Sequence, residues 1–559
     1  MLRHDNKSRS KPFLTLTVTL ILITFCERTV HAKRPHVVFI LADDLGWYDV
    51  GFHGSGMIKT PNIDALAYTG LILNNYYVTP ICTPSRSALM TGKHPIHTGM
   101  QQGVLKGAER RGLPLSEKLL PEYLRELGYV NYIVGKWHLG FYKKEYTPTY
   151  RGFKKHVGFW TGHQDYSDHT AVENHFWGLD MRRDLEPAWD LHGRYSTDVF
   201  TGEAIKIINN HNTSDPLFLY LAHTAVHSGN PYNPLPAPDD VVEKFDWIPD
   251  YKRRRFAAML HKLDRSVGDV IEALKKRDML ADSLIVFSTD NGGPAAGFNL
   301  NAASNWPLRG VKNTLWEGGV RGVGVVWSPK IGQPGRVSNQ LFHITDWLPT
   351  LLSAAEEPEE TISSTISSMN LDGMNLWKAL KDDATSPRQS VLHNIDDAFH
   401  NAAITKNGWK LLRGITYSGA WDRWYESSEA NYTYVEVDVI ESTAGRSLTS
   451  AGSILTPEII RKLRFDATLN CEAPKIRNVC RPTEEDCLFN VSLDPCEFNN
   501  VAKENPEMVR LLGEELKKWN ATAIKPSNKP LDPKGNPKLW NYTWTNFGDY
   551  EKLSNERTN

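Results

Sequence analysis

Four short apolar runs alternate with longer amphipathic stretches through the first half of the chain. Each run is rich in Val, Ile, Leu, Phe and Tyr, which is typical of strands buried on both faces of a parallel sheet. We therefore predict strands at residues 36–41, 129–134, 217–221 and 283–288. Periodicity and stop signals predict helices at residues 61–70, 115–127, 200–209 and 256–276. Strands that alternate with helices indicate an α/β fold.

Acidic side chains follow two of the four predicted strands. Asp43 and Asp44 come after the first run, and Asp290 and Asn291 follow the last. Adjacent carboxylates are costly to place together without a cation, and their oxygens suit a hard cation such as Ca²⁺ or Mg²⁺. A lone Asp-Asp pair could equally be a solvated turn or a helix cap. Two such clusters favour one shared metal site, because α/β sheets bind ligands beyond the carboxyl ends of their strands.

The other two strand ends carry basic and titratable side chains. Lys136 and His138 follow the second run, and His223 and His227 follow the third. Taken alone, the first pattern is more often an ordinary loop, and a single histidine at a strand end is usually structural. These residues become informative only together with the segment around Cys82.

The segment from Cys82 to Gly92 predicts a short helix. Pro84 suits the first helical turn with Thr83 as a candidate cap, and Gly92 can end the helix after about two turns. Cys82 then lies at the helix N-terminus, where unpaired backbone N–H groups favour an anion, and Arg86 can reach back over the same turn. A helix cap with a buried thiol is the simpler alternative.

The N-terminal residues predict a targeting segment rather than part of the fold. Basic residues at positions 7, 9 and 11 precede the apolar run 13–25, and the residues at 30–32 fit a small-residue cleavage site. We expect residues 1–32 to be a signal peptide that sends the protein into the secretory pathway, with a lysosomal or a secreted destination. The run is short for a membrane span, so no stable membrane span is expected, and an uncleaved signal anchor is the alternative.

Four cysteines near the C-terminus fit an exported protein. In the secretory pathway two disulfides are favoured over a zinc site. Sequence alone leaves three connectivities, and we expect the pairs Cys471–Cys480 and Cys487–Cys496. Five N-x-S/T sequons agree with a glycosylated chain, and they begin at Asn212, Asn431, Asn490, Asn520 and Asn541.

The overall charge is balanced. Lys and Arg total 64 and Asp and Glu total 65, which gives a formal net charge of -1. A nucleic-acid-binding protein would normally show a basic surplus, so no nucleic-acid partner is expected. The 559 residues are enough for one large domain and a smaller one.

Three segments resemble the sulfatase family. The pattern C-x-P-x-R followed by S-x-x-x-T-G at residues 82–92 resembles the first signature of that family, and G-Y-x-x-x-x-V-G-K-W-H at residues 128–138 resembles the second. Residues 305–329, which contain Lys312, closely resemble the arylsulfatase B group, N-acetylgalactosamine-4-sulfatase and its relatives. The resemblance covers most of residues 35–415, whereas residues 420–485 resemble nothing that we can place in the family.

The resemblance implies an alkaline-phosphatase-like fold. Such a fold has a large mixed, mostly parallel sheet flanked by helices and a smaller C-terminal α+β subdomain with an antiparallel sheet. We expect the catalytic domain at residues 33–385 and the C-terminal subdomain at residues 386–559, with a cysteine-containing insertion near 420–485. Composition adds two expectations. Residues 141–200 are rich in Tyr, His, Asp and Gly, which suggests a long functional loop over the pocket, and residues 355–370 are rich in Glu, Ser and Thr, which suggests a surface linker.

The resemblance also implies a nucleophile and a metal centre. Cys82 would be oxidised by the formylglycine-generating enzyme to formylglycine, and one hydroxyl of the hydrated aldehyde would attack sulfur. The second hydroxyl would then lose its proton, so that the aldehyde re-forms and sulfate leaves. One Ca²⁺ would be bound by the modified Cys82 and by four oxygen-bearing side chains, Asp43, Asp44, Asp290 and Asn291.

The remaining roles that the resemblance implies concern charge and proton transfer. Arg86 would hold the diol, and Lys136 and Lys312 would bind the sulfate oxygens. His138 would be the base in the elimination step. His227, rather than the other histidine of its strand end, would protonate the leaving alcohol, and neutral-to-acidic pH would help to keep it charged.

These residues predict a sulfatase for sulfated carbohydrates or aryl sulfates. The expected natural substrate is the N-acetylgalactosamine 4-sulfate unit of glycosaminoglycans. One alternative is an arylsulfatase that acts on small-molecule or dietary sulfate esters, and another is a phosphodiesterase or phosphonate hydrolase of the same superfamily. A non-catalytic binder of sulfated glycans is the third, but it would be expected to have lost Cys82, Arg86 or a metal ligand, and none is lost.

Overall fold

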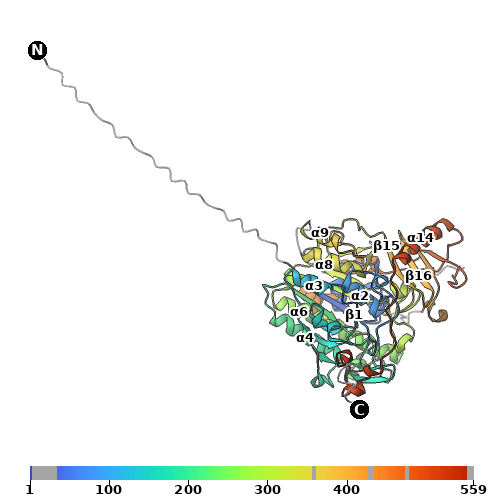
Figure 1. Cartoon of the computed structure of the whole chain (residues 1–559). Helices are drawn as coiled ribbons and strands as arrows, with labels where there is room; N and C mark the ends of the chain where they lie inside the picture. The colour runs from blue at the N-terminus through green and yellow to red at the C-terminus, as the bar shows by residue number, and fades with distance from the viewer. Residues whose placement is uncertain (3–33, 356–359, 426–431, 472–477, 551–559) are drawn as a thin grey trace. The chain divides into compact units, whose positions relative to one another are not determined.

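A computed structural model describes residues 1–2, 34–355, 360–425, 432–471 and 478–550 of the chain (Figure 1). The predicted signal peptide, apart from its first two residues, and the predicted glycosylation site at Asn431 lie outside the described residues. The helices and strands found among these residues lie in the unit that begins at Arg34. Among the residues that are described, no helix is long and apolar enough to cross a membrane.

A ten-stranded mixed sheet lies at the centre of this unit, and its middle is parallel. The parallel strands of this middle part are, in spatial order, β11 (Ser283–Thr289), β1 (His36–Ala42), β10 (Leu217–Ala222), β4 (Val130–Lys136) and β5 (Lys155–Phe159). The flanking strands are β12 (Gly324–Trp327), β2 (Leu71–Leu73) and β13 (Arg336–Ser338) beyond β11, and β8 (Arg182–Arg183) and β9 (Glu186–Pro187) beyond β5. The four apolar runs therefore form four adjacent strands, as a mostly parallel sheet requires.

Strand β1 explains why the apolar runs do not alternate with polar residues. All seven of its residues are buried. Val38 and Ile40 pack into one hydrophobic cluster, whereas Val37, Phe39 and Leu41 pack into another. Successive side chains of a strand point to opposite faces, so both faces of the sheet are covered.

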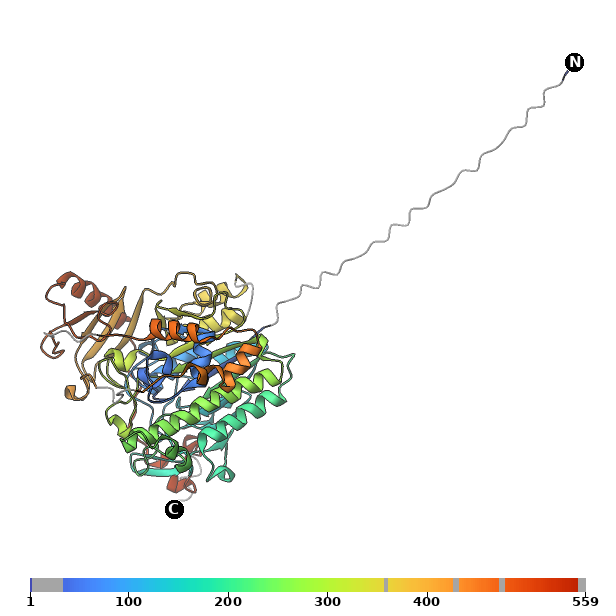
Figure 2. The same ribbon diagram turned by 180° about the vertical axis from the view of Figure 1, so that it is seen from behind.

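Helices supply that cover. The cluster around Val38 contains buried side chains of α1 (Pro61–Thr69), α4 (Ser196–Asn210) and α6 (Tyr251–Lys276), and the last two helices run side by side (Figure 2). The cluster around Val37 contains side chains of three other helices, α2 (Cys82–Thr91), α3 (Leu120–Glu126) and α8 (Trp347–Ala355). The sheet thus has helices on both faces, which is the layering expected of an α/β fold.

Three expectations outside the central strands are wrong in part. The helix expected at 115–127 is only α3, because Pro121 lies in its first turn and favours a helix start there. Part of the expected linker is a helix, α9 (Glu360–Ser368), which buries Ile362 in the core. The expected loop at 141–200 supplies β5, β8 and β9 to the large sheet and a separate hairpin, β6 (Thr170–Glu173) and β7 (Phe176–Leu179).

A second sheet near the C-terminus is antiparallel, as expected. Its strands are β15 (Ser390–Asp396), β16 (Asn401–Lys406), β17 (Trp409–Arg413) and β18 (Cys487–Asn490). Leu512 and Leu516 of α14 (Pro506–Thr522) share a hydrophobic cluster with this sheet. The smaller antiparallel part of the predicted fold is therefore confirmed.

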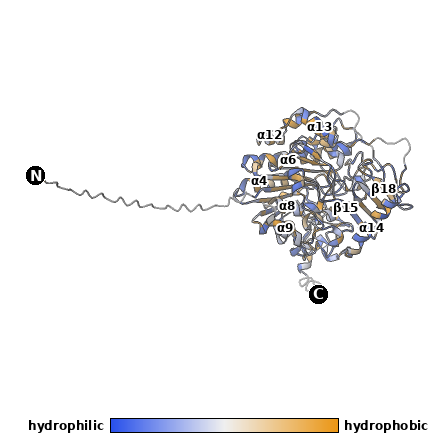
Figure 3. Cartoon of the chain, turned by 90° about the horizontal axis from the view of Figure 1, so that it is seen from above, coloured by the Kyte–Doolittle hydropathy of each residue, from blue (hydrophilic) through white to orange (hydrophobic). Residues whose placement is uncertain are grey.

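The insertion at 420–485 contributes helices that pack on α1 and α6. It contains α11 (Glu436–Ile440), α12 (Thr443–Ser450) and α13 (Pro457–Ala467), and Figure 3 shows α12 beside α6. The backbone N–H of Ala444 donates a hydrogen bond of 3.0 Å to the side-chain oxygen of Asn62 on α1. These helices thus extend the helical layer of the large sheet, and the division of the chain at residue 385 stays a prediction.

The disulfide pairing expected from the sequence is wrong. The structure pairs Cys471 with Cys496 and Cys480 with Cys487, with Cα atoms 6.2 and 5.6 Å apart. Cys487 begins β18 and pairs through the backbone with Leu412 of β17, so the position of that strand decides which thiols meet. Spacing along the sequence does not reveal this position.

Gly135 in β4 gives a stability test of the central sheet. Its φ of 104° is in the left-handed region, and a Cβ there would overlap with the carbonyl oxygen of Ala222 on β10. Gly128 is a matched control, because its φ is 84° and a Cβ would meet nothing within 4 Å. Gly128→Ala should cost about 1–2 kcal/mol for the left-handed backbone alone, and Gly135→Ala a further 1–3 kcal/mol or more.

Thermal or denaturant unfolding of the two variants would measure this difference. Equal destabilisation by the two alanines would contradict the close approach of β4 to β10. Gly135 also precedes Lys136, so its variant should lose activity in addition to stability.

Candidate active site

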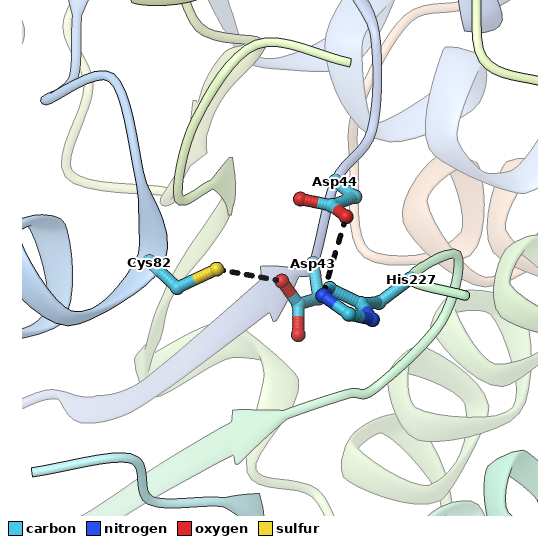
Figure 4. Close-up of side chains that lie close together, drawn as sticks. All are labelled: Asp43, Asp44, Cys82 and His227. Atoms are coloured by element: carbon cyan, nitrogen blue, oxygen red, sulfur yellow. Dashed lines mark hydrogen bonds and ion pairs between the residues drawn. The ribbon is translucent and has the colours of Figure 1, made fainter. Parts of the chain in front are cut away.

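The site begins where β1 ends and α2 starts. Asp43 and Asp44 directly follow β1, and Asp44 has a left-handed φ of 64°, which turns the chain sharply there. Cys82 is the first residue of α2, and its thiol donates a hydrogen bond of 3.7 Å to Oδ1 of Asp43 (Figure 4). The carboxyl edge of the sheet therefore meets the N-terminus of a helix, which is where the sequence predicts a ligand site.

Three buried carboxylates each face a buried cation. The lysine partners lie 2.6 Å from their carboxylates, and the guanidinium donates two hydrogen bonds of 2.8 and 3.1 Å to one oxygen; the pairs are Lys136–Asp43, Lys312–Asp44 and Arg86–Asp290. All six side chains are at most 2% exposed. Buried charges of one sign are too costly to leave unpaired, so these pairs neutralise the site.

Two oxygen atoms of the site lack a hydrogen bond. Oδ1 of Asn291 and Oδ2 of Asp44 are buried without a donor, although the amide of Asn291 donates to Oδ1 of Asp44 at 2.7 Å. Buried oxygens without donors are rare, and they suit a cation that accepts oxygen ligands. The donor set fits a metal on a second count as well, because ligand atoms of four buried side chains lie within 4.8 Å of one another: Asp43, Asp44, Cys82 and His227.

Asp290, a predicted metal ligand, already accepts hydrogen bonds on both of its carboxylate oxygens. One of its oxygens accepts both hydrogen bonds from Arg86, and the other accepts a hydrogen bond of 3.3 Å from the backbone N–H of Asp44. Burial next to Asp43 raises the pKa of Asp290, which Arg86 opposes. Asp290 thus lies in the same network, and its predicted role as a ligand stays a prediction.

The Cys82 thiol is not an activated nucleophile. Burial raises its pKa to about 12, although Lys136 and Lys312 act in the opposite direction. The thiolate is the reactive form of cysteine, so an unmodified Cys82 would be inert at physiological pH. The raised pKa of the thiol is consistent with a residue that becomes reactive only after it has been modified.

His138 is arranged as a base. Its Nε2 donates a hydrogen bond of 2.9 Å to the carbonyl of Leu105, which fixes the proton on that nitrogen and leaves a lone pair on Nδ1. Nδ1 is buried without a hydrogen-bond partner. Burial, with Lys136 and Arg86 nearby, lowers the pKa of His138 well below its usual range, so the ring is neutral.

The structure distinguishes the two histidines after β10. His223 is buried in the core and shares a hydrogen bond of 2.9 Å with Ser266 of α6. His227 lines the cavity, donates from Nδ1 to the carbonyl of Ser228 at 2.7 Å, and places Nε2 3.5 Å from Asp44. The geometry therefore favours His227 for a role in catalysis.

The protonation state expected of His227 is wrong for the free protein. Burial lowers its pKa to about 3, with Lys312 and Lys136 acting in the same direction and Asp44 opposing them. The ring is therefore neutral at neutral-to-acidic pH. A negatively charged group bound between the two lysines would favour the protonated ring.

A cavity of about 480 Å³ opens onto these residues. Cys82, His138, His227 and Lys312 line its catalytic end, together with segments that include Leu105, Lys106, Asn174 and Leu300. A volume of this size suits a small molecule or a sugar residue. The site therefore combines a buried charged end with a more open wall.

Two wall residues were not predicted from the sequence. The His163 ring stacks on that of His227 with centroids 6.0 Å apart and an angle of 16°. Glu173 on β6 accepts hydrogen bonds from the backbone N–H groups of Gly162 (3.0 Å) and Gly107 (2.5 Å). Burial raises the pKa of Glu173 to about 7. The polar composition of 141–200 was the only signal for either residue, and it did not single them out.

The comparisons with known proteins identify the family. The sulfatase family matches residues 35–357 of the chain. Arylsulfatase J of Mus musculus is 39% identical over 534 residues, a match that covers 95% of this chain and 82% of the relative. The chain belongs to the sulfatase family. It is therefore a hydrolase that acts on sulfate esters.

Two further similarities bear on the group and the fold. N-acetylgalactosamine-6-sulfatase of Homo sapiens is 32% identical over 373 residues, covering 62% of this chain and 66% of that protein. The crystal structure of Ps i-CgsB in complex with k-i-k-neocarrahexaose has a TM-score of 0.67 at 26% identity and covers 91% of this chain and 97% of that chain. The alkaline-phosphatase-like sulfatase fold is thus confirmed, whereas these relatives do not confirm membership of the arylsulfatase B group.

Calcium binding gives a test of the metal centre that does not depend on turnover. Adding Ca²⁺ to chelator-treated protein should stabilise it by about 2.7 kcal/mol at 100 times the Kd, seen as a higher Tm. Asp44→Asn should abolish most of that shift. Asp264→Asn is the control, because Asp264 is a buried carboxylate that accepts hydrogen bonds from Asn62 and Ile63 outside the site. A shift that is equal in the two variants would contradict a metal site at Asp44.

Proposed function

We propose that this sulfatase hydrolyses sulfate esters of N-acetylgalactosamine by means of a formylglycine made from Cys82 and a bound Ca²⁺. The observation that carries the proposal is the position of Cys82, at a helix N-terminus and 3.7 Å from Asp43 within the network of paired charges. Its thiol is too weakly acidic to act unmodified. The modified residue supplies a hydroxyl nucleophile that can later be released by re-forming the aldehyde.

The metal would be held by oxygen atoms of the network. Asp43, Asp44 and Asn291 offer carboxylate and amide oxygens, two of which lack hydrogen bonds, and residue 82 and Asp290 would complete the predicted set. When bound, Ca²⁺ polarises the sulfate oxygens and supplies positive charge where negative charge develops.

Two lysines would bind the sulfate, and two histidines would transfer protons. Lys136 and Lys312 would hold the sulfate oxygens, since both lie close enough to residue 82 to act on the pKa of the Cys82 thiol. His138 would accept a proton at its free Nδ1. His227 would donate a proton to the leaving alcohol, and the sulfate charge would favour the protonated ring that this step needs.

Glu173 supports an uncharged sugar as the rest of the substrate. Within the described residues it forms no ion pair, and only two of its acceptor positions are used, by Gly107 and Gly162. A carboxylate has about four acceptor positions, so it can accept further hydrogen bonds from sugar hydroxyl or acetamido N–H groups. Above pH 7, where Glu173 is ionised, it would also repel a second anionic group at that place.

The position of the sulfate is part of the proposal. Residues 305–329 resemble the 4-sulfatase group, whereas one relative is named for the 6-sulfate. We infer the 4-sulfate from the resemblance around Lys312.

The protein is further proposed to enter the secretory pathway through residues 1–32, to meet the formylglycine-generating enzyme there, and to reach a lysosome or the cell exterior.

Cys82→Ala tests the nucleophile. The variant should lose all turnover of an aryl sulfate, because alanine cannot become formylglycine. In chelator-treated protein it should keep its circular dichroism spectrum and Tm, because within the described part of the chain the thiol makes one long hydrogen bond. Activity that survives the substitution would contradict the mechanism. A phosphodiester of the same aryl alcohol separates the rival class: a wild-type preference for the phosphodiester would favour a phosphodiesterase.

Glu173→Gln tests the saccharide. Turnover of N-acetylgalactosamine 4-sulfate should exceed that of the 6-sulfate in the wild type. Above pH 7, where Glu173 is ionised, kcat/KM for the 4-sulfate should fall about tenfold or more in the variant, since hydrogen bonds to charged groups are strong. An aryl sulfate should be affected less. Equal losses on the two substrates would mean that Glu173 only holds the wall together, and a preference for the 6-sulfate would overturn the positional part.

A further inference from the structure

An aromatic cluster lies next to the catalytic cavity, and the roles proposed above use none of it. Phe298 packs edge-on against Tyr417 and Trp421, with ring centroids 5.3 and 5.2 Å apart. Phe399 contacts Tyr417 with a centroid distance of 6.3 Å. We call these four residues the aromatic platform.

Two rings of the aromatic platform are turned to solvent. Phe399 is 42% exposed and Tyr417 41%, whereas Phe298, on which Tyr417 packs, is 5% exposed. A single exposed aromatic side chain is ordinary, but adjacent exposed rings on a packed base are typical of a surface that binds something. The platform therefore needs an explanation other than core packing.

The first connection between the platform and the cavity runs through a short turn. η9 (Phe298–Leu300) begins with the buried platform residue, and its next two residues, Asn299 and Leu300, line the cavity. A molecule that extends from the cavity past Leu300 would thus reach the side of the platform.

The second connection is a pair of hydrogen bonds beside Lys312, which lines the cavity. The side-chain amide of the next residue, Asn313, donates to the Tyr417 hydroxyl at 2.7 Å. The hydroxyl of Thr416 donates to the carbonyl of Asn313 at 3.0 Å. The loop that carries Tyr417 is therefore attached directly to the segment that carries the predicted sulfate ligand.

The backbone holds the platform in place. Leu300, Tyr417 and Ser418 have φ values of 58°, 50° and 54°, in the left-handed region that residues other than glycine seldom adopt. Such conformations cost free energy and persist where surrounding contacts fix them, often at ligand-binding positions. Fixed rings lose little entropy on binding, which favours recognition of a ligand.

The same turn lies beside the predicted leaving-group acid. The side chain of Asn301 donates to the carbonyl of Val226 at 2.9 Å and to the hydroxyl of Ser228 at 3.1 Å, the two residues on either side of His227. The alcohol that His227 protonates would therefore lie near η9, and any group attached to that alcohol would extend toward it.

We propose that the aromatic platform binds the sugar residue adjoining the sulfated one, so that the enzyme recognises a sulfated oligosaccharide rather than a single sugar. This inference rests on the proposed function. The C–H face of a pyranose ring is apolar and can pack on the exposed rings of Phe399 and Tyr417, while its hydroxyls stay in water. The relative Ps i-CgsB was solved with an oligosaccharide, which agrees with such a chain of sugars.

Binding to the Cys82→Ala protein tests the platform without turnover. The probes are the single sugar N-acetylgalactosamine 4-sulfate and a chondroitin disaccharide that carries 4-sulfate, measured by isothermal titration. The disaccharide should bind more tightly than the single sugar, and adding Tyr417→Ala should remove roughly three- to tenfold of that advantage. Tyr417→Phe, which keeps the ring and loses only the hydroxyl, should retain most of it.

Phe465→Ala is the matched control. Phe465 is 74% exposed on α13, outside the platform, so its loss should leave both affinities unchanged. Equal affinities for the two probes, or equal losses for both with Tyr417→Ala, would overturn the platform. If the wild-type enzyme that carries formylglycine cleaves neither probe, that result counts against the proposed function. The platform is judged separately, because the binding comparison does not depend on cleavage.

Discussion

The site depends on the pairing of three buried carboxylates with three buried cations. Asp43, Asp44 and Asp290 cannot all be ionised in the interior unless positive charge lies within a few ångströms, and Lys136, Lys312 and Arg86 supply it. The six residues come from five separate segments of the chain, so the network forms only when the central sheet, α2 and the segment around Lys312 are all in place. The chemistry of the site and its folding are therefore coupled.

The sheet makes this convergence possible. β11, β1, β10 and β4 are adjacent and parallel, so the residues after each strand meet at one edge. Local backbone turns then aim the side chains, as the left-handed φ values of Asp44 (64°) and His138 (57°) show. Such turns are tolerated where surrounding contacts fix them, and here those contacts are the hydrogen bonds and ion pairs of the site itself.

The sequence predicted what depends on local pattern. Non-alternating apolar runs identified the four central strands, and polar residues after each strand identified the groups that meet around Cys82. Features that depend on contacts between distant segments were missed. Cys487 pairs with Cys480 because of the position of β18 in its sheet. Glu173 enters the cavity wall on a hairpin that the composition did not reveal. The protonation state of His227 was misjudged for a related reason, since burial outweighs the nearby carboxylate and burial is not visible in a sequence.

The central claim is that Cys82 is a precursor rather than the working nucleophile. Mass spectrometry of the peptide that carries Cys82, from protein exported by its own cell type, tests this most directly. The account predicts a mass that matches formylglycine at residue 82, together with turnover of a sulfate ester by the same preparation. Unmodified cysteine throughout, in protein that still cleaves sulfate esters, would contradict it.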